Sequence, residues 1–249
     1  MDENGSTRRE FISNAVKLGG GALVLLSGAS ASGENSAEGY DWEAHRYAYL
    51  IDTTKCIGCG SCVRACAAEN SVPDGFFRTW VERYVLSAEA SHVDSPNGGK
   101  DGFPPVEPGF APTKSFFVPK MCNHCKETPC IQVCPVGASY RTKDGVVLVD
   151  AQRCIGCGYC VQACPYGSRF LSPSTHTAEK CTWCYHRITK GMKPACVEVC
   201  PTKTRQFGDM TREDDPVRQA IEHERVAVLQ PQLLTEPHCY YLGLDKEVR

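Results

Sequence analysis

The stretch "CIGCGSCVRAC" at residues 56–66 recurs almost unchanged as "CIGCGYCVQAC" at residues 154–164, with nine of eleven positions identical. Both copies space their cysteines as C-x2-C-x2-C-x3-C, and two further groups follow C-x2-C-x4-C-x3-C and C-x2-C-x11-C-x3-C. In chain order, the four groups are Cys56, Cys59, Cys62 and Cys66; Cys122, Cys125, Cys130 and Cys134; Cys154, Cys157, Cys160 and Cys164; and Cys181, Cys184, Cys196 and Cys200. Of the chain's cysteines, Cys239 alone lies outside every group.

The composition narrows the class of protein. A chain of 249 residues is long enough for one or two domains with a buried core. The formal net charge of −2 does not favour nucleic acid or an anionic membrane as a partner. Seventeen cysteines are far more than an ordinary globular protein contains, so we expect their grouping to determine both fold and function.

The N-terminus resembles a twin-arginine export signal. Arg8 and Arg9 precede a short apolar run, and residues 29–31 ("ASA") offer a small-residue cleavage site. We therefore expect residues 1–31 to be a signal peptide, and the mature protein to act in the periplasm or at the extracytoplasmic face of the membrane. The alternatives are an ordinary amphipathic helix, which the glycines at 19–21 disfavour, and a signal that stays uncleaved as an anchor.

Three kinds of chemistry use many cysteines. Disulfides are usual in exported proteins, but a disulfide scaffold spreads its cysteines, whereas these crowd into groups of eleven to twenty residues. Structural zinc sites usually join two C-x2-C pairs, a pattern that only the last group approaches. The C-x2-C-x2-C-x3-C pattern instead matches bacterial ferredoxins, in which three cysteines hold one iron–sulfur cluster and the fourth holds its neighbour. The spacing therefore favours iron–sulfur clusters.

Short strands are predicted around the cysteine groups. Residues 137–150 ("GASYRTKDGVVLVD") predict a hairpin that turns at residues 143–145 and leads into the third group. "YLIDTTKC" before the first group and "TRQFGD" after the last group predict matching outer strands. We therefore expect groups two and three to form one two-cluster unit, and groups one and four to form a second.

An inserted element is predicted between groups one and two. "FFRTWVERYVL" (residues 76–86) and "KSFFVPKM" (residues 114–121) are rich in aromatic and β-branched residues, which predicts two strands. They enclose "SPNGGKDGFPPVEPG" (residues 95–109), whose prolines and glycines predict a long exposed loop. This loop is either a contact surface for another subunit or a surface loop without a role.

With these groups in place, the chain resembles the four-cluster iron–sulfur subunit of molybdopterin-oxidoreductase-type respiratory complexes. The resemblance spans nearly the whole chain after the signal and includes "AEKCTWCYHRI" and "PACVEVCPTKTRQFGD". The export signal makes the chain most similar to the periplasmic members linked to nitrite, polysulfide, tetrathionate or sulfite respiration. The expected fold is α+β, a duplicated bacterial-type two-cluster ferredoxin with an inserted β-hairpin and long loop.

The resemblance also implies a domain organisation and a set of ligands. The expected domains are the signal peptide at 1–31, a first two-cluster unit at 32–75 and 170–215, the insertion at 76–121, a second two-cluster unit at 122–169, and a C-terminal tail at 216–249. Four [4Fe-4S] clusters with crossed ligation are implied. Their ligands are Cys56, Cys59, Cys62 and Cys200 for cluster 1; Cys122, Cys125, Cys130 and Cys164 for cluster 2; Cys154, Cys157, Cys160 and Cys134 for cluster 3; and Cys181, Cys184, Cys196 and Cys66 for cluster 4.

The function implied by the resemblance is electron transfer without catalysis. The chain would relay electrons between a polytopic quinone-interacting membrane subunit and a molybdopterin or multihaem cytochrome subunit, with no nucleic acid and no small-molecule substrate of its own. The alternatives are a free-standing periplasmic polyferredoxin and an enzyme whose own cluster acts on substrate. We expect His124 and His186, inside cysteine groups, to pack or to donate hydrogen bonds to sulfur, and Cys239 to be an inert buried thiol.

Overall fold

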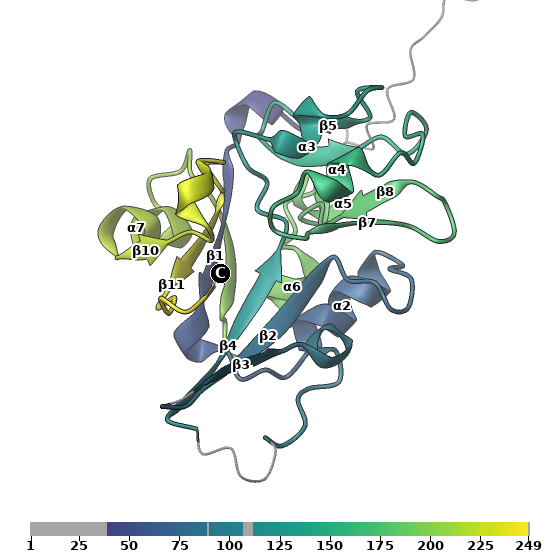
Figure 1. The fold of residues 1–249 in the computed structure, drawn as a ribbon. Coiled ribbons are helices and arrows are strands. Elements are labelled where there is room, and N and C mark those ends of the chain that lie inside the picture. The colour runs from purple at the N-terminus through teal and green to yellow at the C-terminus, as the bar shows by residue number, and fades with distance from the viewer. Residues whose placement is uncertain (1–38, 89, 107–111, 249) are drawn as a thin grey trace, which may run out of the picture. The chain divides into compact units, whose positions relative to one another are not determined.

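The computed structural model describes residues 39–88, 90–106 and 112–248, so the expected signal peptide lies outside the described residues. The described residues form four small sheets joined by short helices, which is the α+β architecture predicted from the sequence (Figure 1). Within these ranges, no helix is long and apolar enough to cross a membrane.

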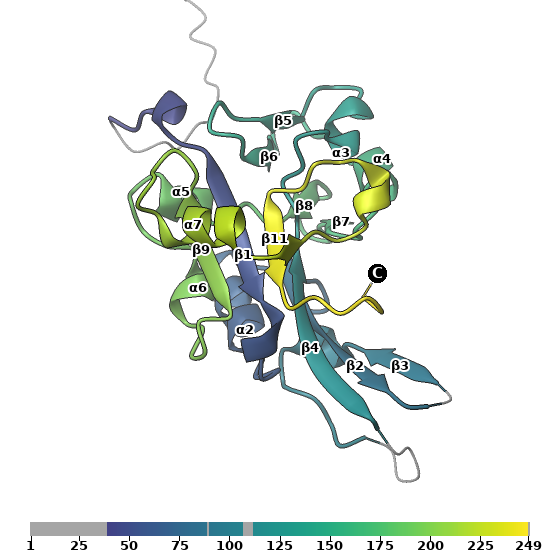
Figure 2. The same cartoon turned by 90° about the vertical axis from the view of Figure 1, so that its left-hand side faces the viewer.

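The largest sheet has the strand order β10-β11-β1-β9. Its strand β1 (Tyr47–Asp52) is almost entirely buried, as its mostly apolar sequence YAYLID requires. β1 pairs antiparallel with β9 (Arg205–Asp209), which confirms the predicted outer strands. On the other edge of β1 lies β11 (Cys239–Leu242), which runs parallel to it and pairs in turn with β10 (Val226–Ala227) (Figure 2). The C-terminal segment therefore extends this sheet, a role that the sequence did not predict.

The insertion forms a second sheet, in the order β3-β2-β4. The two predicted strands are β2 (Thr79–Leu86) and β4 (Lys114–Met121), which pair antiparallel along their full length. A third strand, β3 (Ser91–Asp94), pairs with β2 and was not predicted. The following loop begins with the 3-10 helix η3 (Pro96–Gly99), whose last two residues are buried. The prediction of an exposed loop is therefore wrong at this point.

Two short hairpins complete the sheets. β5 (Ser139–Arg141) and β6 (Val147–Val149) form the predicted hairpin that leads into group three. β7 (Arg169–Leu171) and β8 (Ala178–Lys180) form an equivalent hairpin before group four, which the sequence analysis missed. Each of these hairpins connects one cysteine group to the next.

Short helices accompany the cysteine groups. The helices are η1 (Trp42–Ala44), η2 (Thr53–Lys55), α2 (Ser61–Glu69), α3 (Pro129–Gln132), α4 (Tyr159–Gln162), α5 (Tyr185–Ile188), α6 (Ala195–Glu198), α7 (Pro216–His223) and η4 (Pro231–Leu233). α2 contacts α6, and α3 contacts α4 (Figure 1). Group one therefore lies against group four, and group two against group three, so that one arrangement occurs twice in the chain.

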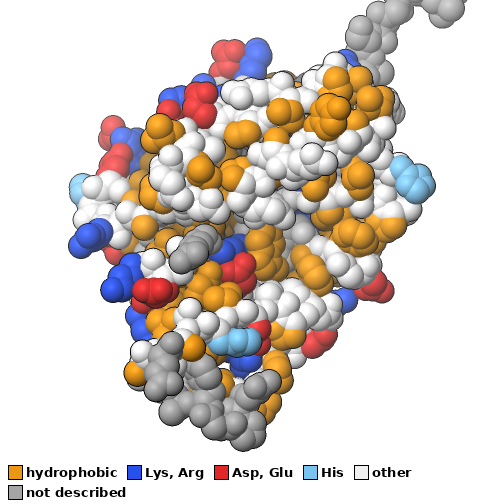
Figure 3. Space-filling view, in the orientation of Figure 1, with side chains coloured by type: hydrophobic (Ala, Val, Ile, Leu, Met, Phe, Trp, Pro, Cys, Tyr) orange, Lys and Arg blue, Asp and Glu red, His pale blue; other side chains and the backbone are white. Residues whose placement is uncertain are grey.

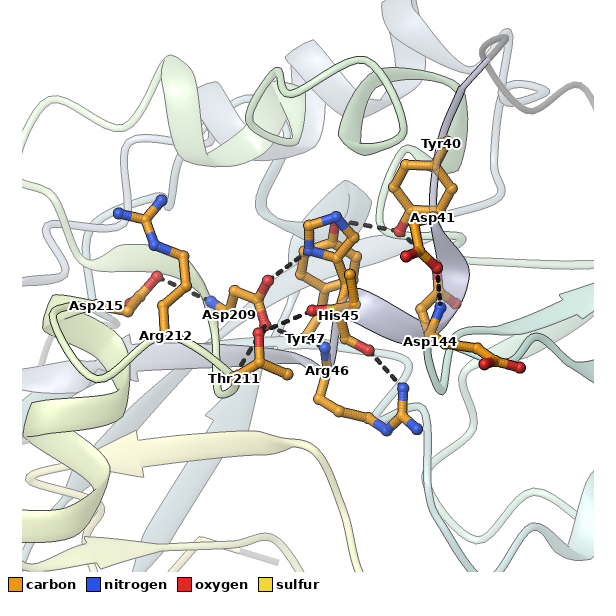
Figure 4. Close-up of polar contacts among 12 residues, drawn as sticks. Tyr40, Asp41, His45, Arg46, Tyr47, Asp144, Asp209, Thr211, Arg212 and Asp215 are labelled. Carbon is orange, nitrogen blue, oxygen red and sulfur yellow. Dashed lines mark hydrogen bonds and ion pairs between the residues drawn. The ribbon is translucent and has the colours of Figure 1, made fainter.

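Groups one and four, with the elements around them, form one half of the molecule, and groups two and three form the other. A polar network joins the segment before β1 to both halves (Figure 4). The hydroxyl of Tyr40 donates a 2.6 Å hydrogen bond to the buried carboxylate of Asp144, in the turn between β5 and β6. Tyr185, from group four's helix α5, donates to the same carboxylate over 3.0 Å. His45 contacts Asp209, at the end of β9, over 2.6 Å. Asp144 thus fixes the hairpin of groups two and three to residues of the other half.

Candidate metal centres

Three small cavities are each lined by three cysteines of one group and the fourth cysteine of another. Their cysteines are Cys122, Cys125, Cys130 and Cys164 in the first cavity; Cys56, Cys59, Cys62 and Cys200 in the second; and Cys181, Cys184, Cys196 and Cys66 in the third. These sets are the same as those that the family resemblance implies for clusters 2, 1 and 4, respectively. Each of these three sets of cysteines thus lines a single cavity.

The fourth implied set of ligands lies nearer the surface. Cys157 is exposed, Cys134 and Cys154 are partly exposed, and Cys160 is buried. The backbone N–H of Ser139 donates to the Cys134 sulfur over 3.5 Å. A cluster held by these four cysteines would have one side close to solvent.

Helix geometry explains how one group contributes to two cavities. Cys62 and Cys66 are four residues apart on α2, so they lie on the same face of the helix and one turn apart. Cys62 lines the second cavity, and Cys66 lines the third. The C-x3-C step that ends each group is thus long enough to reach from one cavity to the next.

Three buried cations lie beside these cavities. Arg169, Lys180 and Arg205 are each no more than 4% exposed. Within the described part of the chain, none of the three forms an ion pair with a carboxylate. Cysteine sulfurs lie near them: Arg205 lines a cavity with Cys62, and Arg169 lines one with Cys130. An unpaired buried charge costs several kcal/mol. The cations therefore fit cavities that hold anionic groups.

Buried donors support the same conclusion. Nε and Nη2 of Arg169, Nε and Nη1 of Arg205, and the indole N–H of Trp183 have no hydrogen-bond partner among the described residues. These side chains line the first, second and third cavities, respectively. Unsatisfied buried donors are rare in proteins. The sulfides and thiolates of an iron–sulfur cluster are acceptors for such donors, so the residues present fit four-iron clusters.

Several of the cavity thiols are disfavoured from ionising by their burial. Burial raises the pKa of Cys56 to about 11 and that of Cys125 to about 12. A metal ligand must be a thiolate, and the positive charge of a metal offsets the cost of burying it. The hydroxyl of Tyr49 lies 3.1 Å from the Cys196 sulfur, where it could donate to a bound thiolate. Hydrogen bonds of this kind tune the reduction potential of a cluster.

The buried cations were not predicted from the sequence, although the sequence contains a signal for two of them. Arg169 and Arg205 each follow the last cysteine of their group by five residues, in "CPYGSR" and "CPTKTR". Both arginines begin the strand that leaves the group, β7 or β9. Lys180 directly precedes the first cysteine of its group, as Lys55 and Arg153 do in groups one and three, but those two side chains are exposed. Only its burial in the folded chain therefore distinguishes Lys180.

The two histidines inside cysteine groups have partners other than sulfur. His124 is buried between the backbone N–H of Val147 and the backbone carbonyl of Cys181, each at 3.0 Å. His186 is half exposed and contacts the carboxylate of Glu69 over 2.7 Å. Both have the expected hydrogen-bonding role, and the partners observed are backbone groups and a carboxylate.

The insertion covers the ligand loop of group one. A Cβ atom added to Gly60 would lie 2.3 Å from the carbonyl oxygen of Gly99, and one added to Gly58 would lie 2.5 Å from the ring of Phe117. A Cβ atom added to Gly158, the corresponding glycine of group three, would have its nearest neighbour, in the side chain of Leu171, 3.7 Å away. Two nearly identical loops therefore differ in what packs on them, and the start of the inserted loop has a structural role.

Comparisons with known proteins point in the same direction. Two family models, both described as a 4Fe-4S dicluster domain, match residues 55–138 and 113–210. The chain is 41% identical over 244 residues to a tetrathionate reductase subunit of Salmonella typhimurium, a match that covers 96% of this chain and 89% of that protein. A tetrathionate reductase subunit of Archaeoglobus fulgidus is 46% identical over 199 residues, which are 80% and 83% of the two chains. The thiosulfate reductase electron transfer subunit PhsB of Salmonella typhi is 42% identical over 165 residues, 66% and 76% of the two chains.

Proposed function

The chain belongs to the iron–sulfur subunits of molybdopterin-oxidoreductase-type respiratory complexes, and from this premise we propose that it holds four [4Fe-4S] clusters with crossed ligation. The observation that carries the proposal is the lining of the cavities, in which three cysteines of one group meet the fourth of another. Clusters 1, 2 and 4 would be held in the cavities, and cluster 3 by the more exposed set. Bound clusters supply reversible one-electron chemistry, while the chain fixes their positions.

The order of the clusters follows from which groups share elements. Clusters 1 and 4 are neighbours because Cys62 and Cys66 lie on one helix, α2. Clusters 2 and 3 are neighbours because groups two and three exchange their fourth cysteines. Cys122, a ligand of cluster 2, is an electrostatic neighbour of Cys181, a ligand of cluster 4. We therefore infer the order 1–4–2–3, with clusters 1 and 3 at the ends.

In this role the chain would relay electrons without catalysing a reaction itself. Its partners would be a polytopic quinone-interacting membrane subunit and a molybdopterin or cytochrome redox subunit. The two tetrathionate reductase relatives and the thiosulfate reductase relative support a complex that reduces a sulfur oxyanion.

Exposed apolar side chains favour a docked subunit over a free polyferredoxin. Around the cluster 3 ligands, the side chains of Ile155, Tyr159 and Val136 are 64%, 57% and 39% exposed. Figure 3 shows hydrophobic side chains gathered on the part of the molecule that carries α3 and α4 in Figure 1. At the other end, Ile57 occupies the position in group one that Ile155 occupies in group three, and it is 59% exposed. Apolar surface beside a terminal cluster suits contact with another protein.

Metal analysis tests the proposal. Anaerobically purified protein should contain roughly sixteen iron atoms and as many acid-labile sulfides per chain, because each cluster has four of each. A preparation with about four zinc ions and no labile sulfide would contradict it.

We further propose that the chain is exported by the twin-arginine route and held at the membrane through its partner. The support is the motif at Arg8 and Arg9 with the small residues that end the apolar run. N-terminal sequencing of the mature subunit should give a start near Ser32. An intact start at Met1 or Asp2 would contradict cleavage and favour an uncleaved anchor.

A further inference from the structure

Lys180 is a buried cation at the junction of the two halves of the molecule. It is the last residue of β8 and precedes Cys181, the first cysteine of group four. Its side chain is 1% exposed. Its ammonium group donates hydrogen bonds to the backbone carbonyls of Val147, in β6, and of Cys181, the latter at 2.7 Å. The charge is therefore held between an element of groups two and three and the first ligand of group four.

A closed ring of hydrogen bonds fixes this position. The backbone N–H of Val147 donates to Nδ1 of His124 over 3.0 Å, so the ring proton of neutral His124 is on Nε2. Nε2 lies 3.0 Å from the carbonyl of Cys181, the same carbonyl that accepts from Lys180. The ring of His124 also stacks on Trp183, with centroids 4.0 Å apart. The Lys180 ammonium group thus has a fixed place in the core.

The charges around Lys180 are unfavourable without an anion nearby. Arg169 lies directly opposite Lys180 in the β7–β8 hairpin, where like charges repel. Along the described parts of the chain, no carboxylate forms an ion pair with either side chain. The Lys180 ammonium group is bonded to one lining residue of each of two cavities: to Val147, which lines the cluster 2 cavity, and to Cys181, which lines the cluster 4 cavity. Burial lowers the pKa of Lys180, and the sulfurs of Cys122 and Cys181 oppose this shift, so an anion in either cavity favours the charged amine.

Each of the two buried arginines lies beside the ligands of two neighbouring clusters, as Lys180 does, but within one half of the molecule. Arg205 has Cys62 of the cluster 1 set and Cys196 of the cluster 4 set as electrostatic neighbours. Arg169 lies near Cys130 of the cluster 2 set and Cys160 of the cluster 3 set. Each step of the order 1–4–2–3 thus has one buried cation beside it.

We propose that Lys180 is a positioning residue for electron transfer between the halves: its fixed charge raises the reduction potentials of clusters 4 and 2 together. The inference rests on the proposed four-cluster function. A cation stabilises the extra negative charge of a reduced cluster, and it does so strongly in a dry interior. Lys180 thereby favours electrons on the two central clusters, on either side of the boundary between the halves.

EPR-monitored redox titration of the intact protein tests this proposal. Lys180→Met removes the charge and should lower two of the four midpoint potentials while leaving the other two unchanged. Arg205→Met should lower the midpoint potentials of two clusters, and one of these should be a cluster whose potential also falls in Lys180→Met. Arg169→Met should likewise lower two midpoint potentials, one of which belongs to the other cluster affected by Lys180→Met. Lys190→Gln, at an exposed position, is the control for loss of a positive charge and should shift none of the four potentials.

The results of this experiment distinguish a failure of the four-cluster function from a failure of the role proposed for Lys180. A wild-type protein with fewer than four cluster signals would contradict the four-cluster function itself. Four signals with no shift in Lys180→Met, a shift in one only, or an equal shift in all would overturn the role of Lys180. If Lys180→Met fails to assemble clusters, Lys180→Gln, which keeps a donor for the Val147 carbonyl, must give the same two shifts.

Discussion

The environment of Cys239 distinguishes this single residue, a structural thiol, from the cysteines that line the cavities. It lies in the middle of a sheet, on β11, opposite Tyr49 of β1, and its side chain is fully buried. The three cavities each have four other cysteines. Burial raises the pKa of its thiol to about 12, so the group stays protonated at neutral pH.

Replacing Cys239 by alanine should therefore leave cluster content unchanged. We expect the same iron content and EPR signals as in the wild type, with a loss of about 1–2 kcal/mol in stability from the small cavity created. In the folded wild-type protein the thiol should resist alkylation at pH 8, where only about one molecule in ten thousand would carry the thiolate. Loss of one cluster in Cys239→Ala would mean that a ligand has been misassigned.

At the scale of elements, the two near-identical cysteine loops provide a matched pair. Gly60 and Gly158 both precede the helix of their group and have positive φ angles of 70° and 77°. A side chain at either position costs about 1–2 kcal/mol in backbone strain. At Gly60, however, a Cβ would also overlap the carbonyl oxygens of Gly99 and Lys100, whereas Gly158 has room.

Gly60→Ala should therefore be much more damaging than Gly158→Ala. We expect Gly60→Ala to lose iron equivalent to at least one cluster, and Gly158→Ala to keep full iron content with a slightly lower melting temperature. Iron analysis and thermal unfolding of both variants measure this difference. Equal behaviour of the two variants would contradict the packing of the insertion on group one.

Local patterns in the sequence predicted some elements and could not predict others. The hairpin β5–β6 was predictable because residues 143–145 ("KDG") are a local turn signal, which residues 172–177 ("SPSTHT") between β7 and β8 lack. β2 and β4 were predictable because they are rich in aromatic and β-branched residues. β11 was not, because its partner β1 is almost two hundred residues earlier and parallel pairing leaves no local signal. Among the buried cations, Arg169 and Arg205 share a spacing after the last cysteine of their groups that the sequence does show. Lys180 has no such signal, because the basic residues Lys55 and Arg153 that precede two other groups are exposed.

At the scale of the whole molecule, the exposed ends of the cluster series are expected to determine which partners can dock. Ile155 is 64% exposed beside the cluster 3 ligands, and Ile57 is 59% exposed beside those of cluster 1. A charge placed at either end would be buried unpaired in an interface, which weakens binding by at least tenfold when the residue is central.

Ile155→Glu should weaken association with one partner subunit and leave iron content unchanged. Ile57→Glu, its counterpart in group one, should weaken association with the other partner. Co-purification of the complex from cells, with iron analysis of the released subunit, measures both effects. Full retention of both partners in both variants would contradict docking at these ends.

The crossed ligation is the central claim, and cysteine substitution followed by EPR tests it most directly. If Cys66 is a ligand of cluster 4, then Cys66→Ser should alter the same EPR signal as Cys181→Ser, in variants that retain the other three clusters. The signal altered by Cys56→Ser, which belongs to cluster 1, should be unaffected by Cys66→Ser. If Cys66→Ser instead alters the Cys56→Ser signal and spares that of Cys181→Ser, each group binds its own cluster, and crossed ligation is contradicted.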